Sequence, residues 1–194
     1  MQVGVLALQG DFAAHGAALA VLGAEARWVR RAADLEGLPG LVLPGGESTT
    51  MLKLLAQEGF TAPLREFART HPVLATCAGA ILLAQRVRQP EQASLGLLDL
   101  TVIRNGYGRQ LESSIRSARV SPQFQAGLGT RELEAVLIRA PRFVELGPQV
   151  EVVAEESGEA VLVRQGNLIA ASFHPELSSQ SYVHRWFLDL IQSG

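Results

Sequence analysis

In the first half of the chain, short apolar runs alternate with longer segments whose apolar residues recur at helical spacing. Gly23 is placed to end the first helical segment, and Asp11 is placed to begin it. Strands that alternate with helices in this way predict right-handed crossovers and a mostly parallel sheet. The pattern predicts strands over residues 3–8, 26–29, 40–43 and 73–76, and helices over residues 12–22, 48–57, 63–69 and 77–85.

The pattern changes in the second half, where strand-like stretches follow one another closely with glycines at the turns. This half is expected to be antiparallel and rich in hairpins. The last segment, residues 178–191, carries Tyr182, Trp186, Phe187 and Leu190 at helical spacing and is expected to pack on the sheet. The predicted strands are residues 97–103, 118–120, 133–138, 150–155, 160–164 and 168–173.

Together the two halves predict an α/β fold of three layers. A flavodoxin-like, mostly parallel sheet has helices on both faces, and the C-terminal half is antiparallel and hairpin-rich. The 194 residues, 47% hydrophobic and 19% charged, fit one compact domain over residues 1–194. The net charge of -2 gives no basic field to neutralise a phosphate backbone, so nucleic acid is not an expected partner.

Membrane insertion and secretion are not expected either. The apolar runs are far shorter than the ~20 residues of a membrane-spanning helix. The N-terminal run has no basic region before it and no signal cleavage site, so it reads as a strand. Cys77 is the only cysteine and forms no internal disulfide, which agrees with a reducing compartment. We therefore expect a cytoplasmic protein, and the one thiol becomes the first candidate for chemistry.

Cys77 stands where a buried strand enters a helix, in the run Val-Leu-Ala-Thr-Cys-Ala-Gly-Ala-Ile. Small residues around it are typical of a nucleophile elbow, a strained turn that presents one side chain above the carboxyl edge of a sheet. A thiol at a helix N-terminus is activated by the helix dipole, and the nearby N–H groups can hold an oxyanion. The alternative is a small buried hydrophobe, which is what most free cysteines are.

His174, Pro175 and Glu176 follow the last predicted strand. Pro175 favours an extended backbone at His174, and residues two apart then project to the same side, so the imidazole and the carboxylate can meet. The carboxylate would fix the tautomer and leave the other ring nitrogen to take the thiol proton. A solvated turn and a metal-binding pair are the alternatives. The other histidines, expected in surface or packing roles, are His15, His71 and His184.

The run Leu-Pro-Gly-Gly-Glu-Ser-Thr-Thr, residues 43–50, follows a strand and begins a helix. Its paired glycines permit close backbone approach, and Ser48 and Thr49 are expected to cap the helix. The run lacks the Gly-Lys-Ser/Thr ending of a phosphate loop, so nucleotide binding is not indicated. By itself it is explained as a tight turn, and together with Cys77 it also fits an oxyanion hole.

Three runs in this order, Pro-Gly-Gly-Glu-Ser, Thr-Cys-Ala-Gly and His-Pro-Glu, resemble the class I glutamine amidotransferases. Further runs are similar to one branch of that superfamily, the glutaminase subunits of pyridoxal 5′-phosphate synthases. They are Gly-Val-Leu-Ala-Leu-Gln-Gly at 4–10, Gly-Gly-Glu-Ser-Thr-Thr-Met at 45–51, Arg-Asn-Gly-Tyr-Gly-Arg-Gln at 104–110, Ile-Arg-Ala-Pro at 138–141 and Ser-Phe-His-Pro-Glu-Leu at 172–177. The likeness covers essentially the whole chain.

The resemblance implies a glutaminase that hydrolyses L-glutamine to L-glutamate and ammonia, with Cys77, His174 and Glu176 as its triad. Ammonia would pass to a separate (β/α)₈-barrel synthase that makes pyridoxal 5′-phosphate. No cofactor and no metal are implied for this chain. Members of the family are weakly active until the synthase docks and orders the oxyanion hole.

The resemblance also assigns residues by motif match. The oxyanion would be held by the N–H groups of Gly46 and Ala78, and Gln9 would lie near the synthase interface. Glutamine would contact Gly46, Glu47, Ser48, Arg104, Ile138 and Arg139.

Two positions depart from the family pattern: Ala75 stands where many relatives have glycine, and Ala80 replaces a larger apolar residue. We expect an altered fit of the elbow at most. Two other functions are alternatives. One is a glutaminase subunit of another synthase, such as one serving imidazole glycerol phosphate synthesis, against which the run at 104–110 argues. The other is a docking subunit without catalysis, against which the intact triad argues.

Overall fold

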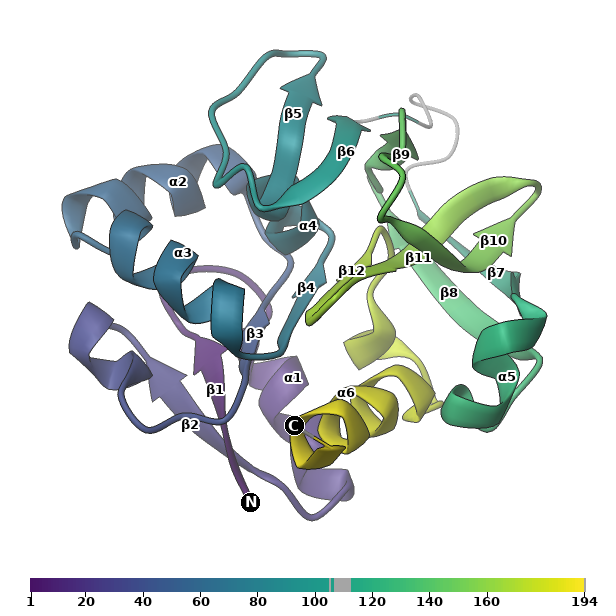
Figure 1. Cartoon of the computed structure of the whole chain (residues 1–194), viewed down its shortest axis with the longest axis horizontal. Coiled ribbons are helices and arrows are strands. Elements are labelled where there is room, and N and C mark those ends of the chain that lie inside the picture. Colours follow the sequence, from purple (N-terminus) through teal and green to yellow (C-terminus); the bar gives the residue numbers. More distant parts are fainter. Residues whose placement is uncertain (105, 107–112, 194) are drawn as a thin grey trace.

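A computed structural model describes residues 1–104, 106 and 113–193, and Figure 1 shows its arrangement. The strands are β1 (Gln2–Leu6), β2 (Glu25–Val29), β3 (Leu41–Leu43), β4 (Val73–Thr76), β5 (Ala84–Arg88), β6 (Leu98–Ile103), β7 (Ser113–Val120), β8 (Glu132–Ile138), β9 (Arg142–Val144), β10 (Glu151–Glu156), β11 (Glu159–Gln165) and β12 (Leu168–Ala171). The α-helices are α1 (Phe12–Val21), α2 (Ser48–Gln57), α3 (Thr61–Thr70), α4 (Ala78–Leu83), α5 (Pro122–Leu128) and α6 (Tyr182–Ser193), and the short 3₁₀ helices are η1 (Ala32–Leu35) and η3 (Pro175–Leu177).

The larger sheet has the strand order β2-β1-β3-β4-β12-β11-β10-β7-β8. From β2 to β12 each neighbouring pair is parallel. From β12 to β8 each neighbouring pair is antiparallel. Strand β12 therefore joins a parallel N-terminal half to a hairpin-rich C-terminal half, and the predicted α/β fold is confirmed.

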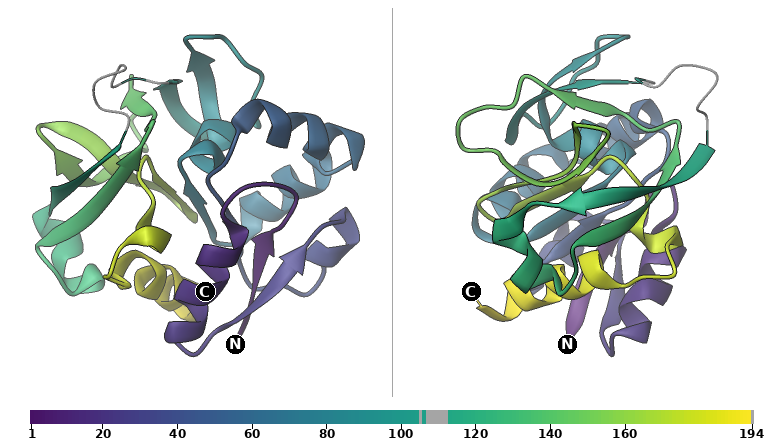
Figure 2. Two further views of the ribbon diagram at one scale, coloured as in Figure 1. Left: turned by 180° about the vertical axis from the view of Figure 1, so that it is seen from behind. Right: turned by 90° about the vertical axis from the view of Figure 1, so that its right-hand side faces the viewer.

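Alternate residues of the parallel strands face two different hydrophobic cores, because successive side chains of a strand point to opposite faces of the sheet. In β3, Leu41 and Leu43 pack in one core and Val42 packs in the other. The first core includes buried side chains of α2, α3 and α4, and the second includes those of α1, α5 and α6. The sheet thus lies between two helical layers, as Figures 1 and 2 show.

A second sheet, with the order β5-β6-β9, packs against the first core and was not predicted. The sequence pattern predicts a helix over residues 77–85, but α4 ends at Leu83. Ala84 instead pairs with Leu98 in β6, and the N–H of Leu97 donates to the carbonyl of Leu83 at 2.9 Å. These long-range hydrogen bonds use backbone groups that a longer helix would need, and they end the helix.

The C-terminal half contains more regular structure than its pattern predicts. Strand β7 begins at Ser113 rather than at residue 118, because it pairs with β8 along its whole length. Strand β9 and helix α5 were not predicted. Helix α5 nevertheless has ordinary end signals, with Pro122 in its first turn and Gly129 in the left-handed region at its end.

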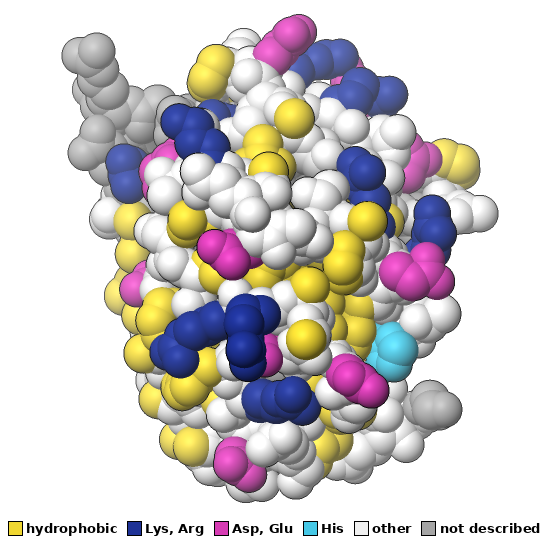
Figure 3. Space-filling model, turned by 90° about the vertical axis from the view of Figure 1, so that its left-hand side faces the viewer, with side chains coloured by type: hydrophobic (Ala, Val, Ile, Leu, Met, Phe, Trp, Pro, Cys, Tyr) yellow, Lys and Arg dark blue, Asp and Glu magenta, His cyan; other side chains and the backbone are white. Residues whose placement is uncertain are grey.

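Charged side chains of both signs are interspersed on the side of the molecule where α2 and α3 lie (Figure 3). Hydrophobic side chains lie between them, and several Lys or Arg side chains gather in the lower part of that face beside acidic ones. Within the described ranges, no helix combines the length and the apolar character that crossing a bilayer requires.

Candidate active site

Cys77 lies between β4 and α4, at the carboxyl end of a strand in the middle of the larger sheet. Its φ of 46° lies in the left-handed region, which is strained for a residue with a side chain. Its N–H donates to the carbonyl of Ala171 in neighbouring β12 at 2.9 Å, and the residue is 8% exposed. The predicted elbow is therefore present, on a shorter helix than expected.

The elbow requires a glycine at position 79. A Cβ there would collide with the carbonyl oxygen of Leu43, so α4 packs directly on the backbone of β3. Ala75 and Ala80, the two departures from the family pattern, are both fully buried in the first core. Their effect on the fit of the elbow stays a prediction.

His174 and Glu176 come from the turn that follows β12. Nδ1 of His174 lies 2.7 Å from Oε1 of Glu176, and the Glu176 side chain is completely buried. A carboxylate only accepts hydrogen bonds, so Nδ1 carries the proton and Nε2 is left for the thiol. The contact that the two-residue spacing predicts is therefore present.

Opposing effects set the pKa of His174. Burial lowers the pKa, whereas the hydrogen bonds to Cys77 and Glu176 and the negative charge of both groups raise it, to about 10. The imidazolium form is therefore stabilised between the thiol and the carboxylate.

The glycine turn before α2 lies against His174 and Cys77. A Cβ at Gly45 would come within 2.5 Å of Cε1 of His174, so a larger residue would displace the imidazole. Gln9, which follows β1, accepts a hydrogen bond at its Oε1 from the N–H of Glu47 at 2.9 Å. Gln9, expected near a partner interface, thus lies within the site and fixes the peptide between Gly46 and Glu47.

Glu47, rather than Ser48 or Thr49, caps α2. Its carboxylate accepts from the N–H of Thr49 at 3.2 Å and from the N–H of Thr50 at 2.7 Å. Burial raises the pKa of Glu47, but these bonds and one from the Thr50 hydroxyl outweigh it and lower the pKa to about 2. The predicted capping by Ser48 and Thr49 is wrong, because both hydroxyl groups donate to Oε1 of Gln92 instead.

Gln92 belongs to the site although its sequence context does not indicate it. It lies in the loop between β5 and β6, which has no periodic pattern. Besides the Ser48 hydroxyl, at 3.0 Å, its Oε1 accepts from Nη1 of Arg104 at 2.8 Å. Nη2 of Arg104 also lies 3.3 Å from Oε1 of Glu47. Gln92 therefore fixes two of the side chains that the family resemblance assigns to glutamine binding.

All of the predicted glutamine contacts line one cleft of about 350 Å³, together with the thiol and the imidazole. Glu176 lies behind His174, and Ala78 is the first residue of α4. In the run at residues 104–110, positions 105 and 107–110 lie outside the described residues. The cleft is lined by Gln9, Gly10, Asp11, Gly46, Glu47, Ser48, Cys77, Ile81, Arg104, Ile138, Arg139 and His174.

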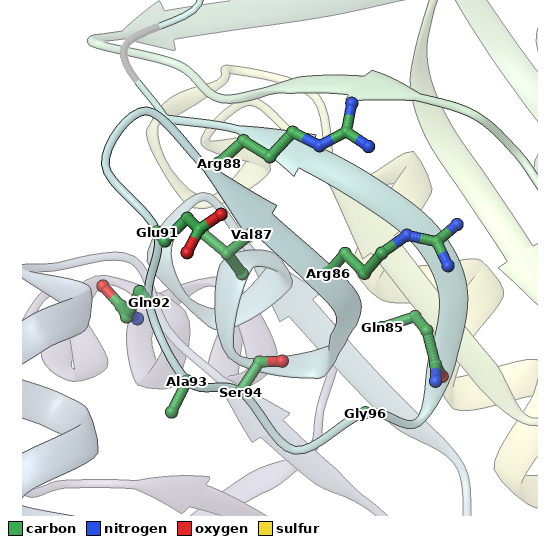
Figure 4. Close-up of a pocket in the computed structure, with 9 residues that line it drawn as sticks. All are labelled: Gln85, Arg86, Val87, Arg88, Glu91, Gln92, Ala93, Ser94 and Gly96. Atoms are coloured by element: carbon green, nitrogen blue, oxygen red, sulfur yellow. The ribbon is translucent and has the colours of Figure 1, made fainter.

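A larger hollow of about 750 Å³ lies beside β5, and Figure 4 shows the side chains that line it. Its two arginines extend away from the loop that carries Gln92 (Figure 4). Arg88 pairs with Glu145 at 2.8 Å, and Arg86 donates to the Thr101 hydroxyl at 3.1 Å. Its described lining residues include neither a cysteine nor a histidine, so it offers no counterpart of the chemistry around Cys77.

Asp11, His174 and Glu176 each place one ligand-type atom within 4.8 Å of the others. Nδ1 of His174 is already the proton donor to Glu176, so it does not bind a cation while that hydrogen bond persists. The expectation that the chain uses no metal stays a prediction.

Two histidines lie in unexpected places. His15 on α1 and His184 on α6 are fully buried, with Nδ1 of His15 and Nε2 of His184 3.0 Å apart. Nε2 of His15 also lies 3.3 Å from Oε2 of Glu176. The surface or packing role expected for His15 does not account for this contact, which forms because the fold brings α1 and the turn after β12 together. His71 stacks on Phe67 with ring centroids 4.3 Å apart, which is a packing role.

Comparison with known proteins identifies the family. Residues 5–193 match the SNO glutamine amidotransferase family. The chain belongs to this family. The resemblance inferred from the three motifs is thereby confirmed, and the cleft around Cys77 is the candidate active site of a glutamine amidotransferase.

Curated relatives of this amidotransferase are similar over their whole length. The chain is 51% identical to "Pyridoxal 5'-phosphate synthase subunit PdxT" of Koribacter versatilis (strain Ellin345), over 100% of this chain and 97% of the relative. It is 46% identical to the protein of the same name from Niallia circulans, over 100% of both chains.

Solved structures agree with the fold. A structure described as "Crystal structure of glutamine amidotransferase" has a TM-score of 0.90 and 47% identity, and covers 98% of each chain. A structure described as "Structure of PurLQS from Thermotoga maritima" has a TM-score of 0.72 at 18% identity, over 97% of each chain. The second likeness concerns the fold alone.

Proposed function

We propose that this amidotransferase hydrolyses L-glutamine to L-glutamate and ammonia, with Cys77 as nucleophile, His174 as general acid and base, and Glu176 orienting His174. The observation that carries the proposal is the juxtaposition at the elbow. A strained, almost buried thiol lies beside an imidazole whose Nδ1 is 2.7 Å from a fully buried carboxylate. This arrangement supplies an activated nucleophile and a proton donor for the leaving group.

In the first step the Cys77 thiolate attacks the side-chain amide carbon of glutamine, and a C–S bond forms. His174 donates a proton to the amide nitrogen, the C–N bond breaks and ammonia leaves. The neutral imidazole then takes a proton from water, which attacks the γ-glutamyl thioester. The C–S bond breaks, glutamate leaves, and the Cys77 thiolate beside the protonated His174 is restored, so the two half-reactions add up to amide hydrolysis.

The N–H groups of Gly46 and Ala78 are proposed to hold the oxyanion of each tetrahedral intermediate. Ala78 is the first residue of α4, where an N–H has no acceptor within the helix. Gln9 accepts a hydrogen bond from the N–H of Glu47 and thereby holds the peptide between Gly46 and Glu47. This contact restricts the orientation of Gly46. Loss of one such donor typically costs about 10²–10³ in turnover.

The substrate's α-carboxylate is proposed to bind Arg104 or Arg139, since a guanidinium makes strong charge-assisted hydrogen bonds with carboxylates. Glu47, whose pKa is lowered to about 2, is ionised at neutral pH and suits the α-ammonium group. Gly46, Ser48 and Ile138 complete the proposed glutamine contacts.

We further infer that ammonia passes to a separate (β/α)₈-barrel synthase that makes pyridoxal 5′-phosphate. Two relatives named as PdxT subunits of that synthase support this inference. They are 51% and 46% identical to this chain over its full length. This full-length similarity favours that partner over the synthase of imidazole glycerol phosphate. A cytoplasmic location and one amidotransferase domain over residues 1–194 belong to the same proposal.

The test is to assay the chain together with the barrel synthase. Wild type should release glutamate and support pyridoxal 5′-phosphate formation from glutamine. Cys77→Ala should abolish both, yet the complex should still form pyridoxal 5′-phosphate when ammonium salts replace glutamine. Glutamine-dependent product with Cys77→Ala would reject the proposed nucleophile, and no glutamate release by wild type would favour a docking subunit without catalysis.

A further inference from the structure

His15 and His184 place two polar rings inside the apolar layer formed by α1, α6 and the larger sheet. Both side chains are fully buried, and a buried polar group is costly unless it is hydrogen-bonded. Nε2 of His15 lies 3.0 Å from the hydroxyl of Thr76, the residue before the nucleophile. The pair therefore contacts the strand that carries Cys77 as well as the buried carboxylate of Glu176.

The two oxygens of Glu176 differ in their surroundings. Oε1 accepts from His174 at 2.7 Å, whereas Oε2 is buried and has no well-aligned donor among the described residues. Among the ion pairs of the described residues, Nε2 of His15 is the nitrogen that lies nearest to Oε2, at a distance of 3.3 Å. A buried carboxylate oxygen needs a donor to offset its lost hydration, and His15 is placed to supply it.

The contacts fit one assignment of the ring protons. With its proton on Nε2, His15 faces the Thr76 hydroxyl at 3.0 Å and Oε2 of Glu176 at 3.3 Å, and its Nδ1 then accepts from Nε2–H of His184. Burial lowers the pKa of His15, and so does its proximity to His184 and His174, which keeps it neutral. Burial lowers the pKa of His184 to about 4, which keeps it neutral as well.

We propose that His15, held in one tautomer by His184, is a positioning residue that orients the Glu176 carboxylate for the catalytic imidazole. The series of polar contacts then runs from His184 through His15 and Glu176 to His174 and Cys77. His15 touches neither substrate nor thiol, and it acts by fixing the oxygen that does not face His174. The inference rests on the proposed glutaminase function.

The charged and titratable groups around this series come from three elements. His184 belongs to α6, and Glu176 and His174 belong to the turn after β12. Asp11, at the start of α1, places a carboxylate oxygen within 4.8 Å of ligand atoms of both His174 and Glu176. Of these, only Glu176 has an oxygen within 4 Å of the His15 ring in the described structure.

Two polar replacements of His15 separate its two contacts. In His15→Gln the amide nitrogen reaches about as far as Nε2, so a donor toward Glu176 and Thr76 is kept. In His15→Asn the amide reaches only about as far as Nδ1, so the contact with His184 is kept and the donor to Glu176 is lost. His15→Leu removes both contacts.

The measurement is glutamine hydrolysis in the complex with the barrel synthase, over a range of pH. His15→Asn and His15→Leu should lower kcat about 10-fold with little change in KM, because general acid–base catalysis depends on an oriented imidazole. The alkaline limb of the kcat/KM profile should move to lower pH, since a displaced Glu176 stabilises the imidazolium less. His15→Gln should keep the wild-type limb and most of kcat.

Leu19→Ala is the matched control for packing. Leu19 lies one turn further along α1 and is fully buried in the second core. It should lower thermal stability while leaving the alkaline limb in place. The inference is overturned if His15→Asn matches His15→Gln in both kcat and limb, or if Leu19→Ala moves the limb as much as His15→Asn does. A wild type without glutaminase activity would instead reject the proposed function.

Discussion

At the scale of single residues, the chemistry depends on how the neighbours of His174 change its protonation. Cys77 is 8% exposed and the Glu176 side chain is completely buried, so His174 lies between two groups that are shielded from solvent. Burial alone would make His174 a weak base, and its partners reverse that effect. The pKa of His174 therefore shows whether its contacts with Cys77 and Glu176 are intact.

Replacement of Cys77 by alanine should lower the pKa of His174 well below about 10. The reason is that the imidazolium loses a hydrogen-bonded, negatively charged partner while its burial persists. Nitrogen NMR of the imidazole through a pH titration measures this directly. An unchanged His174 pKa in Cys77→Ala would show that the thiol and the imidazole do not interact.

At the residue scale, sequence reasoning brings together the residues of the proposed triad because each lies in a short run with its own geometric meaning. Cys77 is recognised by the small residues of an elbow, and His174 and Glu176 by their two-residue spacing. The sequence does not reveal His15 as a partner of Glu176, because α1 and the turn after β12 meet only in the folded molecule.

At the scale of elements, the loop between β5 and β6 matters more than its sequence suggests. It carries Gln92 to the first turn of α2 and to Arg104, where one amide oxygen accepts from three side chains. The opposite amide orientation would place an NH₂ group against the guanidinium, so the observed one is required. The loop thereby fixes the side chains proposed to bind glutamine.

Gln92→Leu should raise KM for glutamine about 10-fold and leave kcat within about 2-fold, because hydrogen bonds to charged groups contribute roughly 1.5–3 kcal/mol and the triad is untouched. Steady-state glutaminase kinetics with the synthase present would measure the effect. Gln85→Leu is the matched control, since Gln85 is exposed on β5 and does not line the catalytic cleft. Equal KM values for the two variants would contradict a role of Gln92 in glutamine binding.

The boundaries of helices and strands are predicted best where the backbone hydrogen bonds are local, and worst where they join segments distant in sequence. Helix α2 is predicted from residue 48 to residue 57, as observed, because its apolar spacing is regular. Helix α4 is predicted too long, since the pairing of Ala84 with Leu98 decides its end and no local pattern contains that information.

At the scale of the whole molecule, one sheet connects the proposed triad and the glycine turn. The proposed triad comes from the residue that follows β4 and from the turn that follows β12. Strands β4 and β12 are adjacent and parallel. The glycine turn follows β3, the other neighbour of β4. Because carboxyl ends of parallel strands meet at one edge, segments distant in sequence converge there. The order of strands, which the sequence pattern does not specify, is therefore what assembles the cleft.

Stability should fall as the pH is lowered below about 6.5. His184, with a folded pKa of about 4, stays neutral when folded, whereas the unfolded chain takes up a proton. The unfolded state then binds more protons, so the free energy of unfolding decreases by about 1.4 kcal/mol per pH unit for this group between pH 6.5 and 4. His15, whose pKa is also lowered, adds to the effect.

Denaturant titrations of wild type and His184→Leu at several pH values between 4 and 6.5 would test this dependence. The variant should show a shallower loss of stability with falling pH, because one group that charges only on unfolding is gone. His71→Leu, on the opposite layer of helices, should keep the wild-type slope. The same slope in His184→Leu as in wild type would contradict a neutral, buried His184.

The most direct test of the central claim is covalent capture of the nucleophile. The complex with the barrel synthase would be treated with an electrophilic glutamine analogue, and the intact mass of this chain measured. The account predicts one adduct per chain, located at Cys77 by peptide mass spectrometry, suppressed by excess glutamine and absent in Cys77→Ala. An adduct that persists in Cys77→Ala, or a wild-type chain that stays unmodified while it releases glutamate, would contradict it.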